Sequence, residues 1–294
     1  MTSPLLAREI VASETMFGAD YWYVIAAFVF LAGACVGSFL NVCIYRIPNE
    51  RSIITPGSRC YACGKPLKFW MNLPILSWFL LRGRAGCCDV KLDSRYLMVE
   101  LLTAICFVLL WWWYWRTPEL FFAYAVFVGM LIAGSGVDID LHMIPNRFTL
   151  GLAVVGIVAS ALVPELHDAD SVWASVKTSL WGAFLGALIL FVIAQIGEYV
   201  FKKPAMGLGD VKLMAGLGAF LGPESIAWVI PISAMVGSVW GIWLILGSRG
   251  SWGTAIPYGP FLAVAAILYP LIGHVVVEAY IEEIARTFDN RSVF

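Results

Sequence analysis

Residues 207–213 read Gly-Leu-Gly-Asp-Val-Lys-Leu and stand between a short charged loop and an apolar segment. An ionised carboxylate such as that of Asp210 is costly at membrane depth unless it has a partner or water, so an aspartate there indicates a functional site. Gly207 and Gly209 have no Cβ atoms, which lets the backbone bend sharply and lets a peptide substrate approach closely. A single Gly-x-Gly-Asp sequence is a weak signal. Asp138, at the end of another apolar run, is a second candidate of the same kind.

The composition predicts an all-α polytopic membrane protein. Of the 294 residues, 61% are hydrophobic and 13% charged, and the mean hydropathy of +0.83 is above that of a soluble globular domain. Gly182 and Gly186 have the small-x-x-x-small spacing of a helix packing face. The first apolar run is long enough to span, so no cleavable signal peptide is expected. About eight spans are predicted, at residues 22–45, 97–115, 120–137, 179–200, 211–221, 226–246 and 256–277, with a fourth in chain order that has Pro145 in its first turn and runs to about residue 163.

The basic residues gather in one loop. Residues 46–96 hold nine of the nineteen Lys and Arg residues and three acidic residues. By the positive-inside rule this loop is expected in the cytoplasm, as a small subdomain between the first two helices. Membrane lipid is an expected partner and nucleic acid is not. The predicted parts are an N-terminal segment with the first helix (1–45), the subdomain (46–96), a seven-helix membrane domain (97–280) and a C-terminal tail (281–294).

Four of the seven cysteines lie in this loop, as Cys60, Cys63, Cys87 and Cys88. The cytoplasm is reducing, so a bound metal is a better interpretation than disulfides. A structural Zn²⁺ normally uses Cys-x-x-Cys twice. Here the second pair is adjacent, and Ala85 stands where a second Cys-x-x-Cys would place a thiol. A structural zinc, which needs local backbone distortion, and a metal-free loop are both open.

Other apolar residues are expected to have packing roles. The aromatic segment 69–81, between the cysteine pairs, is expected to pack on the membrane surface or on the subdomain. Cys35, Cys43 and Cys106 lie in apolar runs and are expected to be small core residues.

Counting spans from the basic loop brings the two aspartates to one membrane depth. Asp138 falls at the cytoplasmic end of the third span and Asp210 at the cytoplasmic start of the sixth. Two carboxylates close together do not both ionise cheaply, so such a pair holds one proton. One carboxylate can then activate a water as base while the other protonates a peptide carbonyl as acid. The residues favour aspartyl proteolysis at the membrane border.

Other classes fit less well. His142, His167 and His274 are scattered and form no His-Glu-x-x-His motif of a zinc protease, and no convincing Gly-x-Ser-x-Gly elbow of a serine protease is present. A transporter could use the same carboxylates as an ion relay, although inverted repeats with matching broken helices are not evident. Asp138 and Asp210 could also be ordinary charges at helix ends.

Ordered motifs extend over roughly residues 33–265. They are residues 37–42 with 45–48, 60–63, 72–78 with 81–83, 95–96 with 99–102, 138 with 144–146, 207–213, and 256–263. Together they resemble the type IV prepilin peptidases, which are bifunctional leader peptidases and N-methyltransferases of bacterial pilus and type II secretion systems. The resemblance implies a multi-pass enzyme of the inner membrane with its active site facing the cytoplasm. It also implies removal of the basic leader of a prepilin or pseudopilin, followed by methylation of the new N-terminal amine with S-adenosylmethionine.

The resemblance also implies roles for single residues. Asp138 and Asp210 match the family's catalytic aspartates. Asp138 is preferred to Asp140 because it stands eight residues before Asn146 of the Pro-Asn pair.

Candidates for methyl transfer are Asn41, Arg46 and Glu100, which are polar groups near one membrane face. This chain departs from the family at two positions, because Ala85 replaces its third cysteine and Cys87 is additional. The cysteine loop is associated with methyl transfer in the family. A peptidase without methyltransferase activity is therefore an alternative, as is an ion-coupled or proton-coupled transporter.

Overall fold

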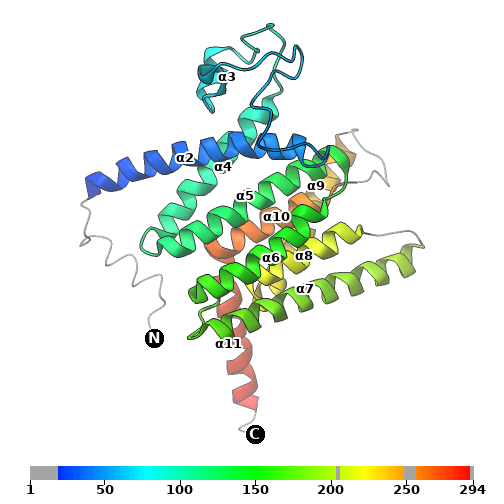
Figure 1. The fold of residues 1–294 in the computed structure, drawn as a ribbon. Helices are drawn as coiled ribbons and strands as arrows, with labels where there is room; N and C mark the ends of the chain where they lie inside the picture. The colour runs from blue at the N-terminus through cyan, green and yellow to red at the C-terminus, as the bar shows by residue number, and fades with distance from the viewer. Residues whose placement is uncertain (1–18, 203–205, 248–255, 292–294) are drawn as a thin grey trace. The chain divides into compact units, whose positions relative to one another are not determined.

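The computed structural model describes residues 19–202, 206–247 and 256–291, and this part of the chain is helical without a named strand (Figure 1). The all-α class is therefore confirmed. In a bilayer a helix satisfies its backbone hydrogen bonds internally, which explains why each long apolar run became one. The α-helices are α2 (Ala19–Arg46), α3 (Leu76–Leu80), α4 (Ser94–Tyr114), α5 (Pro118–Leu141), α6 (Asn146–Leu162), α7 (Val172–Phe201), α8 (Leu208–Leu221), α9 (Ile226–Leu246), α10 (Gly259–Leu268) and α11 (His274–Arg291). Short helical turns are η1 (Phe69–Asn72), η2 (Pro164–His167), η3 (Pro223–Ser225) and η4 (Tyr269–Gly273).

The predicted number of spans is too high. Among the described residues, six helices are long and apolar enough to cross a membrane. The helices α6 and α8, with 17 and 14 residues, fall short, because at 1.5 Å per residue they are only about 25 and 21 Å long, against about 30 Å of hydrocarbon. Most of α8 is buried by protein, so its length need not match the bilayer.

The chain forms two compact units. Unit 1 comprises Met1–Phe39 and Gly57–Trp115, and unit 2 comprises Leu40–Pro56 and Arg116–Phe294. The helix α2 contributes to both. The four-part division predicted from the sequence stays a prediction, although α11 extends the described helix to Arg291, within the expected tail.

Small residues bring α2 and α4 together in unit 1. A Cβ atom added at Gly33 or Gly37 would lie 2.7–2.8 Å from a Cα atom of α4, so the two backbones are in direct contact. Cys106 on α4 is buried, as is Cys43 in unit 2, which confirms the expectation for both. The expectation for Cys35 was wrong. It is exposed, because it points from α2 away from the face that carries the two glycines.

In unit 2, α8 packs against both α6 and α7 (Figure 1). A Cβ atom at Gly182 of α7 would overlap the carbonyl oxygen of Gly218 on α8, and one at Gly186 would lie 2.7 Å from a carbonyl oxygen of α8. The predicted packing face is therefore confirmed. Ser179 adds an interhelical hydrogen bond, since its Oγ donates to the carbonyl of Ala219 at 2.7 Å.

The helix α10 connects the remaining parts of unit 2. It packs against α5, α8 and α9 and is followed by the π-helical turn η4, which contains Pro270. A proline removes a backbone donor and interrupts the regular hydrogen-bond pattern of a helix. The contacts of α10 with α5 and α8 hold its start beside the end of α5 and the start of α8.

Replacement of Gly182 by alanine is expected to destabilise the protein by about 1–3 kcal/mol, as overpacking does, because its new methyl group would meet backbone of α8. Thermal unfolding of the purified protein in detergent measures this. Gly151→Ala on α6 is the matched control. Its Cβ atom would have only the flexible tip of Met130 at 3.5 Å, and alanine favours helix. Equal unfolding temperatures for Gly182→Ala and the wild type would contradict the packing argument.

Candidate active site

Asp138 lies in the last turn of α5 and is only 4% exposed. Its Oδ2 accepts a hydrogen bond of 3.1 Å from the backbone N–H of Gly259, the first residue of α10. The first N–H groups of a helix have no partner within it. The N-terminus of α10 therefore provides both a donor and a favourable dipole for this carboxylate.

Asp210 is half-buried in the first turn of α8, where its N–H donates to the carbonyl of Gly207 at 3.1 Å. The two carboxylates are close enough to interact electrostatically. Ile144 lies between their supports, with its backbone nitrogen 3.8 Å from a Cβ position at Gly209 and its Cδ1 2.7 Å from one at Gly259. The end of α5 and the starts of α8 and α10 thus meet. Asp138, in the last turn of α5, faces the N-terminus of α10, and Asp210 lies in the first turn of α8.

Asp140, the alternative to Asp138, is exposed, whereas Asp138 is buried against α10. Chemistry alone could not separate two aspartates two residues apart. Burial favours Asp138, although its catalytic role stays a prediction.

Sequence reasoning missed a pair of hydroxyl groups beside the aspartates. The hydroxyl oxygens of Tyr258 and Ser233 are 2.6 Å apart, and Ser233 Oγ lies 2.9 Å from the carbonyl oxygen of Ile230. With the serine proton donated to that carbonyl, the tyrosine proton is donated to the serine. Tyr258 precedes Gly259 and interacts electrostatically with Asp210. Tyr258 lies within the sequence motif 256–263, but no pattern in the sequence identifies Ser233 on α9 as its hydrogen-bond partner.

A second missed contact joins the first turns of α6 and α8. Nζ of Lys212 donates to Oδ1 of Asn146 at 3.0 Å. A cation at a helix N-terminus is unfavourable for the helix dipole. The hydrogen bond to Asn146 compensates for this by giving the ammonium group of Lys212 a polar partner on α6.

Gly207 and Gly209 have space around them. The nearest atom to a Cβ position is 3.5 Å away at Gly207 and 3.8 Å away at Gly209, which are ordinary contacts. Gly207 also has an extended backbone that any residue can adopt. Among the described residues, packing therefore does not require glycine at either position. Their predicted role in substrate approach stays a prediction.

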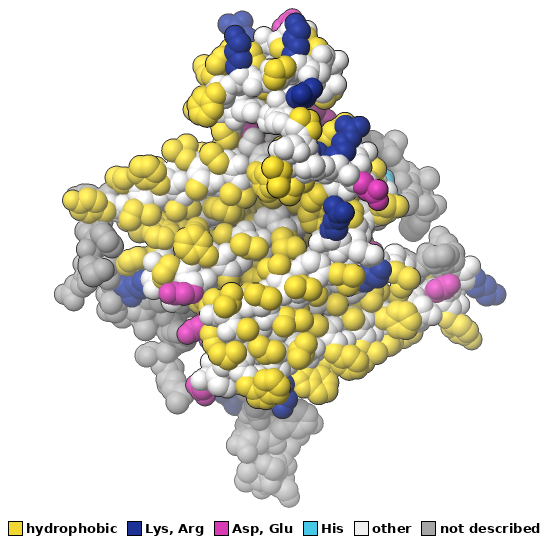
Figure 2. Space-filling view, in the orientation of Figure 1, with side chains coloured by type: hydrophobic (Ala, Val, Ile, Leu, Met, Phe, Trp, Pro, Cys, Tyr) yellow, Lys and Arg dark blue, Asp and Glu magenta, His cyan; other side chains and the backbone are white. Residues whose placement is uncertain are grey.

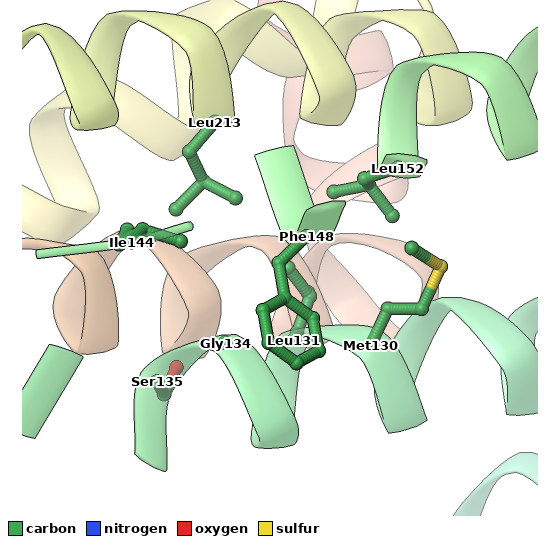
Figure 3. Close-up of a pocket in the computed structure, with 8 residues that line it drawn as sticks. All are labelled: Met130, Leu131, Gly134, Ser135, Ile144, Phe148, Leu152 and Leu213. Carbon is green, nitrogen blue, oxygen red and sulfur yellow. The ribbon is translucent and has the colours of Figure 1, made fainter. Parts of the chain in front are cut away.

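A small apolar cavity lies near the aspartates, between α5, α6 and α8 (Figure 3). Its volume is about 10 Å³, which is room for one water at most. Figure 3 shows Leu213 of α8 beside Ile144, with Phe148 pointing toward α5. This side of the site is filled by side chains, so a peptide must approach from elsewhere, where Gly207 is exposed.

The four loop cysteines form a compact cluster in unit 1, with all sulfur atoms within 4.8 Å of one another. The Sγ–Sγ distances are 3.6 Å for Cys60–Cys88, 3.4 Å for Cys63–Cys87 and 3.9 Å for Cys87–Cys88. A tetrahedral Zn²⁺ with Zn–S bonds of about 2.3 Å requires separations of about 3.8 Å, so the cluster fits the ion. The distortion that adjacent cysteines need is present at Asp89, whose φ is +58°.

Charge in the cluster favours a cation. Backbone N–H groups, of Cys63 above all, lower the pKa of the Cys60 thiol to about 6. The pKa of Cys87 is raised to about 12, mainly by the Cys63 thiol. The Cys60 thiolate forms easily, whereas hydrogen bonding to neighbouring sulfur atoms keeps the Cys87 thiol neutral. A divalent ion would favour the thiolate form of all four cysteines.

The candidates for methyl transfer belong to two different units. Glu100, 8% exposed, lies in unit 1, where its Oε2 accepts a 2.7 Å hydrogen bond from the N–H of Ile75. Ile75 has a φ of +63°, a strained conformation for a β-branched residue. Asn41 and Arg46 lie in unit 2. Asn41 is buried, and Arg46 donates to the carbonyl of Ser52 at 3.0 Å.

Fold and site define a class: a multi-pass helical membrane protein with two aspartates at adjoining helix ends. The family model described as Bacterial Peptidase A24 N-terminal domain matches residues 31–114, and that described as Type IV leader peptidase family matches residues 125–242. The chain belongs to the type IV leader peptidase family.

Similar curated proteins agree with this membership. The Prepilin leader peptidase/N-methyltransferase of Dichelobacter nodosus is 34% identical over 273 residues, which are 84% of this chain and 91% of that protein. The protein of the same name from Myxococcus xanthus is 37% identical over 227 residues, 76% of this chain and 64% of that one. The Type 4 prepilin-like proteins leader peptide-processing enzyme of an Escherichia coli O78:H11 strain is 32% identical over 81% of this chain and 90% of its own. No solved structure matches the chain.

Gly259→Ala is expected to lower peptidase activity by about 100-fold, the order that a misplaced catalytic group can cost. The new Cβ atom would lie 2.7 Å from Oδ2 of Asp138 and push that carboxylate away. Gly134→Ala, one turn before Asp138 on α5, is the matched control, since its nearest neighbour would be 3.6 Å away. Peptide cleavage by each variant, beside its unfolding temperature, is the measurement. Wild-type activity of Gly259→Ala would contradict the assignment.

Proposed function

We propose that this chain is a membrane-embedded aspartyl endopeptidase that removes the basic leader from type IV prepilin or pseudopilin precursors. The observation that carries the proposal is the convergence of Asp138 and Asp210 at the N-termini of α10 and α8. Membership of the type IV leader peptidase family and the names of the relatives support it. The location proposed is the bacterial inner membrane.

The proposed chemistry uses the two carboxylates as a pair. One aspartate takes a proton from a water while the other donates a proton to the scissile carbonyl. The Gly259 N–H fixes the orientation of Asp138, and the two helix N-termini stabilise negative charge as it moves between the carboxylates. The exposed backbone at Gly207 gives an extended peptide access beside Asp210.

The proposed active site faces the cytoplasm. The segment 46–96 holds nine of the nineteen Lys and Arg residues and is expected there by the positive-inside rule. Asp138 lies near the end of α5 and Asp210 near the start of α8. A transporter would place its carboxylates at the bilayer midplane, so positions at helix ends favour a peptidase.

Asp138→Asn and Asp210→Asn are each expected to abolish leader cleavage while the protein still folds and inserts. An amide cannot act as the base or hold the shared proton. Asp140→Asn is the matched control and is expected to retain activity. Co-expression with a candidate precursor and N-terminal sequencing of the product is the test. Processing at the wild-type rate by either single mutant would refute the assignment of Asp138 and Asp210 as a catalytic pair.

The cysteine cluster is proposed to hold one structural Zn²⁺ through Cys60, Cys63, Cys87 and Cys88. The ion, when bound, would cross-link a subdomain too small to bury a large core. The sulfur distances support this, although Ala85 stands at the family's third cysteine.

Metal analysis of the purified protein is expected to give one zinc per chain, and Cys87→Ser is expected to lower that content. Cys35→Ser, which removes an exposed thiol outside the cluster, should not change it. Chelation should make the loop sensitive to limited proteolysis. A metal-free protein with a protease-resistant loop would favour the alternative interpretation.

Methylation of the new N-terminus is proposed as the second activity. S-adenosylmethionine, when bound, supplies an electrophilic methyl group. Glu100 is the strongest candidate residue among the three, because it is a buried carboxylate held by the Ile75 N–H and would attract a cationic ligand or amine. Asn41 and Arg46 are proposed as further candidates.

Glu100→Gln is expected to lose methylation and keep cleavage, because glutamine still accepts the Ile75 hydrogen bond but carries no charge. Mass analysis of the mature substrate's N-terminus reports both activities. The matched control is Glu119→Gln, in the first turn of α5 in unit 2. An unmodified amine from the wild-type protein would make the chain a peptidase only.

A further inference from the structure

Large apolar side chains stand uncovered in the loop of unit 1. Phe69 is 83% exposed, Phe79 61% and Leu80 72%. Trp70 and Leu76 are exposed as well. The sequence left open whether this segment packs on the subdomain or on the membrane surface. The ring of Trp78 packs beside Gly83 of the subdomain, but this packing leaves the side chains of Phe69, Phe79 and Leu80 uncovered.

The exposed side chains belong to elements too short to be stable alone. The turn η1 has four residues and α3 has five, well below the length at which an isolated helix is stable in water. Contiguous exposed apolar patches usually mark an interaction surface. Residues 69–80 therefore need a partner surface.

A bilayer is held close to this segment by the chain itself. The loop leaves the candidate span α2 and enters the candidate span α4 at Ser94, which is 14 residues after Leu80. Such a linker reaches at most about 50 Å. The bilayer surface is therefore present at high effective concentration, as a tethered partner would be.

The charges around the segment match an anionic surface. Residues 57–93 contain six basic and two acidic side chains. Lys68 directly precedes Phe69, and Lys65 lies one turn's length before it. Figure 2 shows basic side chains near hydrophobic ones in the part of unit 1 at the top of the view. Aromatic residues next to lysines are typical of segments at the membrane interface.

We infer that residues 69–80 dock onto the anionic surface of the bilayer that holds α2 and α4. The side chains of Phe69, Phe79 and Leu80 enter the headgroup region, and Lys65 and Lys68 face lipid phosphates. Docking holds the cysteine subdomain against the membrane. The inference depends on membrane insertion of α2 and α4 and not on the peptidase activity.

Photo-cross-linking identifies what covers the patch. The full chain carries p-benzoylphenylalanine in place of Phe79 and is reconstituted into nanodiscs containing phosphatidylglycerol. Irradiation is expected to give lipid adducts by mass spectrometry. The same probe in place of Lys91, an exposed residue of the same subdomain, should give few. Adducts to another segment of the chain, to a second copy, or to no lipid would overturn the inference.

Hydrogen exchange tests the role of charge. The N–H of Met71 donates to the carbonyl of Lys68 and that of Leu81 to the carbonyl of Ser77. Both bonds involve the segment, so the exchange of these N–H groups reports its opening. The double variant Lys65→Gln and Lys68→Gln should raise their exchange roughly 30-fold in phosphatidylglycerol discs, at about 1 kcal/mol per basic residue. Phosphatidylcholine discs should show no such change.

Lys177→Gln at the start of α7, a lysine outside unit 1, is the matched control and should leave exchange unchanged. Equal effects of the double variant in both lipids would overturn the anionic surface as the partner. Neither cross-linking nor hydrogen exchange involves peptide cleavage. A negative result would therefore contradict the membrane docking of residues 69–80 and leave the proposed peptidase activity unaffected.

Discussion

The hydrogen bond from the Gly259 N–H to Asp138 is the interaction on which the candidate site depends. A carboxylate that is almost fully buried needs a donor, and a helix N-terminus is a strong one. This requirement fixes the start of α10 against the end of α5. It also explains the glycine, because a Cβ atom there would come within 2.7 Å of the carboxylate oxygen. The contacts of α10 with α8 and α9 then bring Asp210, Tyr258 and Ser233 to the same place.

The helix α8 can carry Asp210 to this point because it does not have to span the bilayer. Protein surrounds it, and its backbone touches that of α7 where Gly182 meets Gly218. Close backbone packing leaves little freedom to slide along the neighbouring helix. The first turn of α8 is therefore held in register with α10, and the spacing of the two aspartates follows from helix packing far from them.

Unit 1 is organised by a different constraint. Its loop has only short helical turns and two isolated β-bridges among the described residues, so little apolar surface is buried there. The sulfur cluster and the hydrogen bond from Ile75 to Glu100 hold its shape, including the strained backbone at Ile75 and Asp89. A loop built in this way needs outside support, and a metal ion and the lipid surface are supports that its chemistry suits.

The sequence by itself determined the helices, because a long apolar run has few alternatives in a bilayer. The predicted span 226–246 coincides with α9. Asp210 and the cysteines were singled out by their chemistry and spacing, whereas the choice of Asp138 over Asp140 needed the family resemblance. Tertiary structure alone decided which groups meet. The partner of Asp138 is 121 residues away, Ser233 carries no local signal, and Cys35 faces outward although its neighbours are apolar. Hydropathy reports how well a residue suits lipid or protein interior and does not distinguish the two, so only helix packing determines which face is covered.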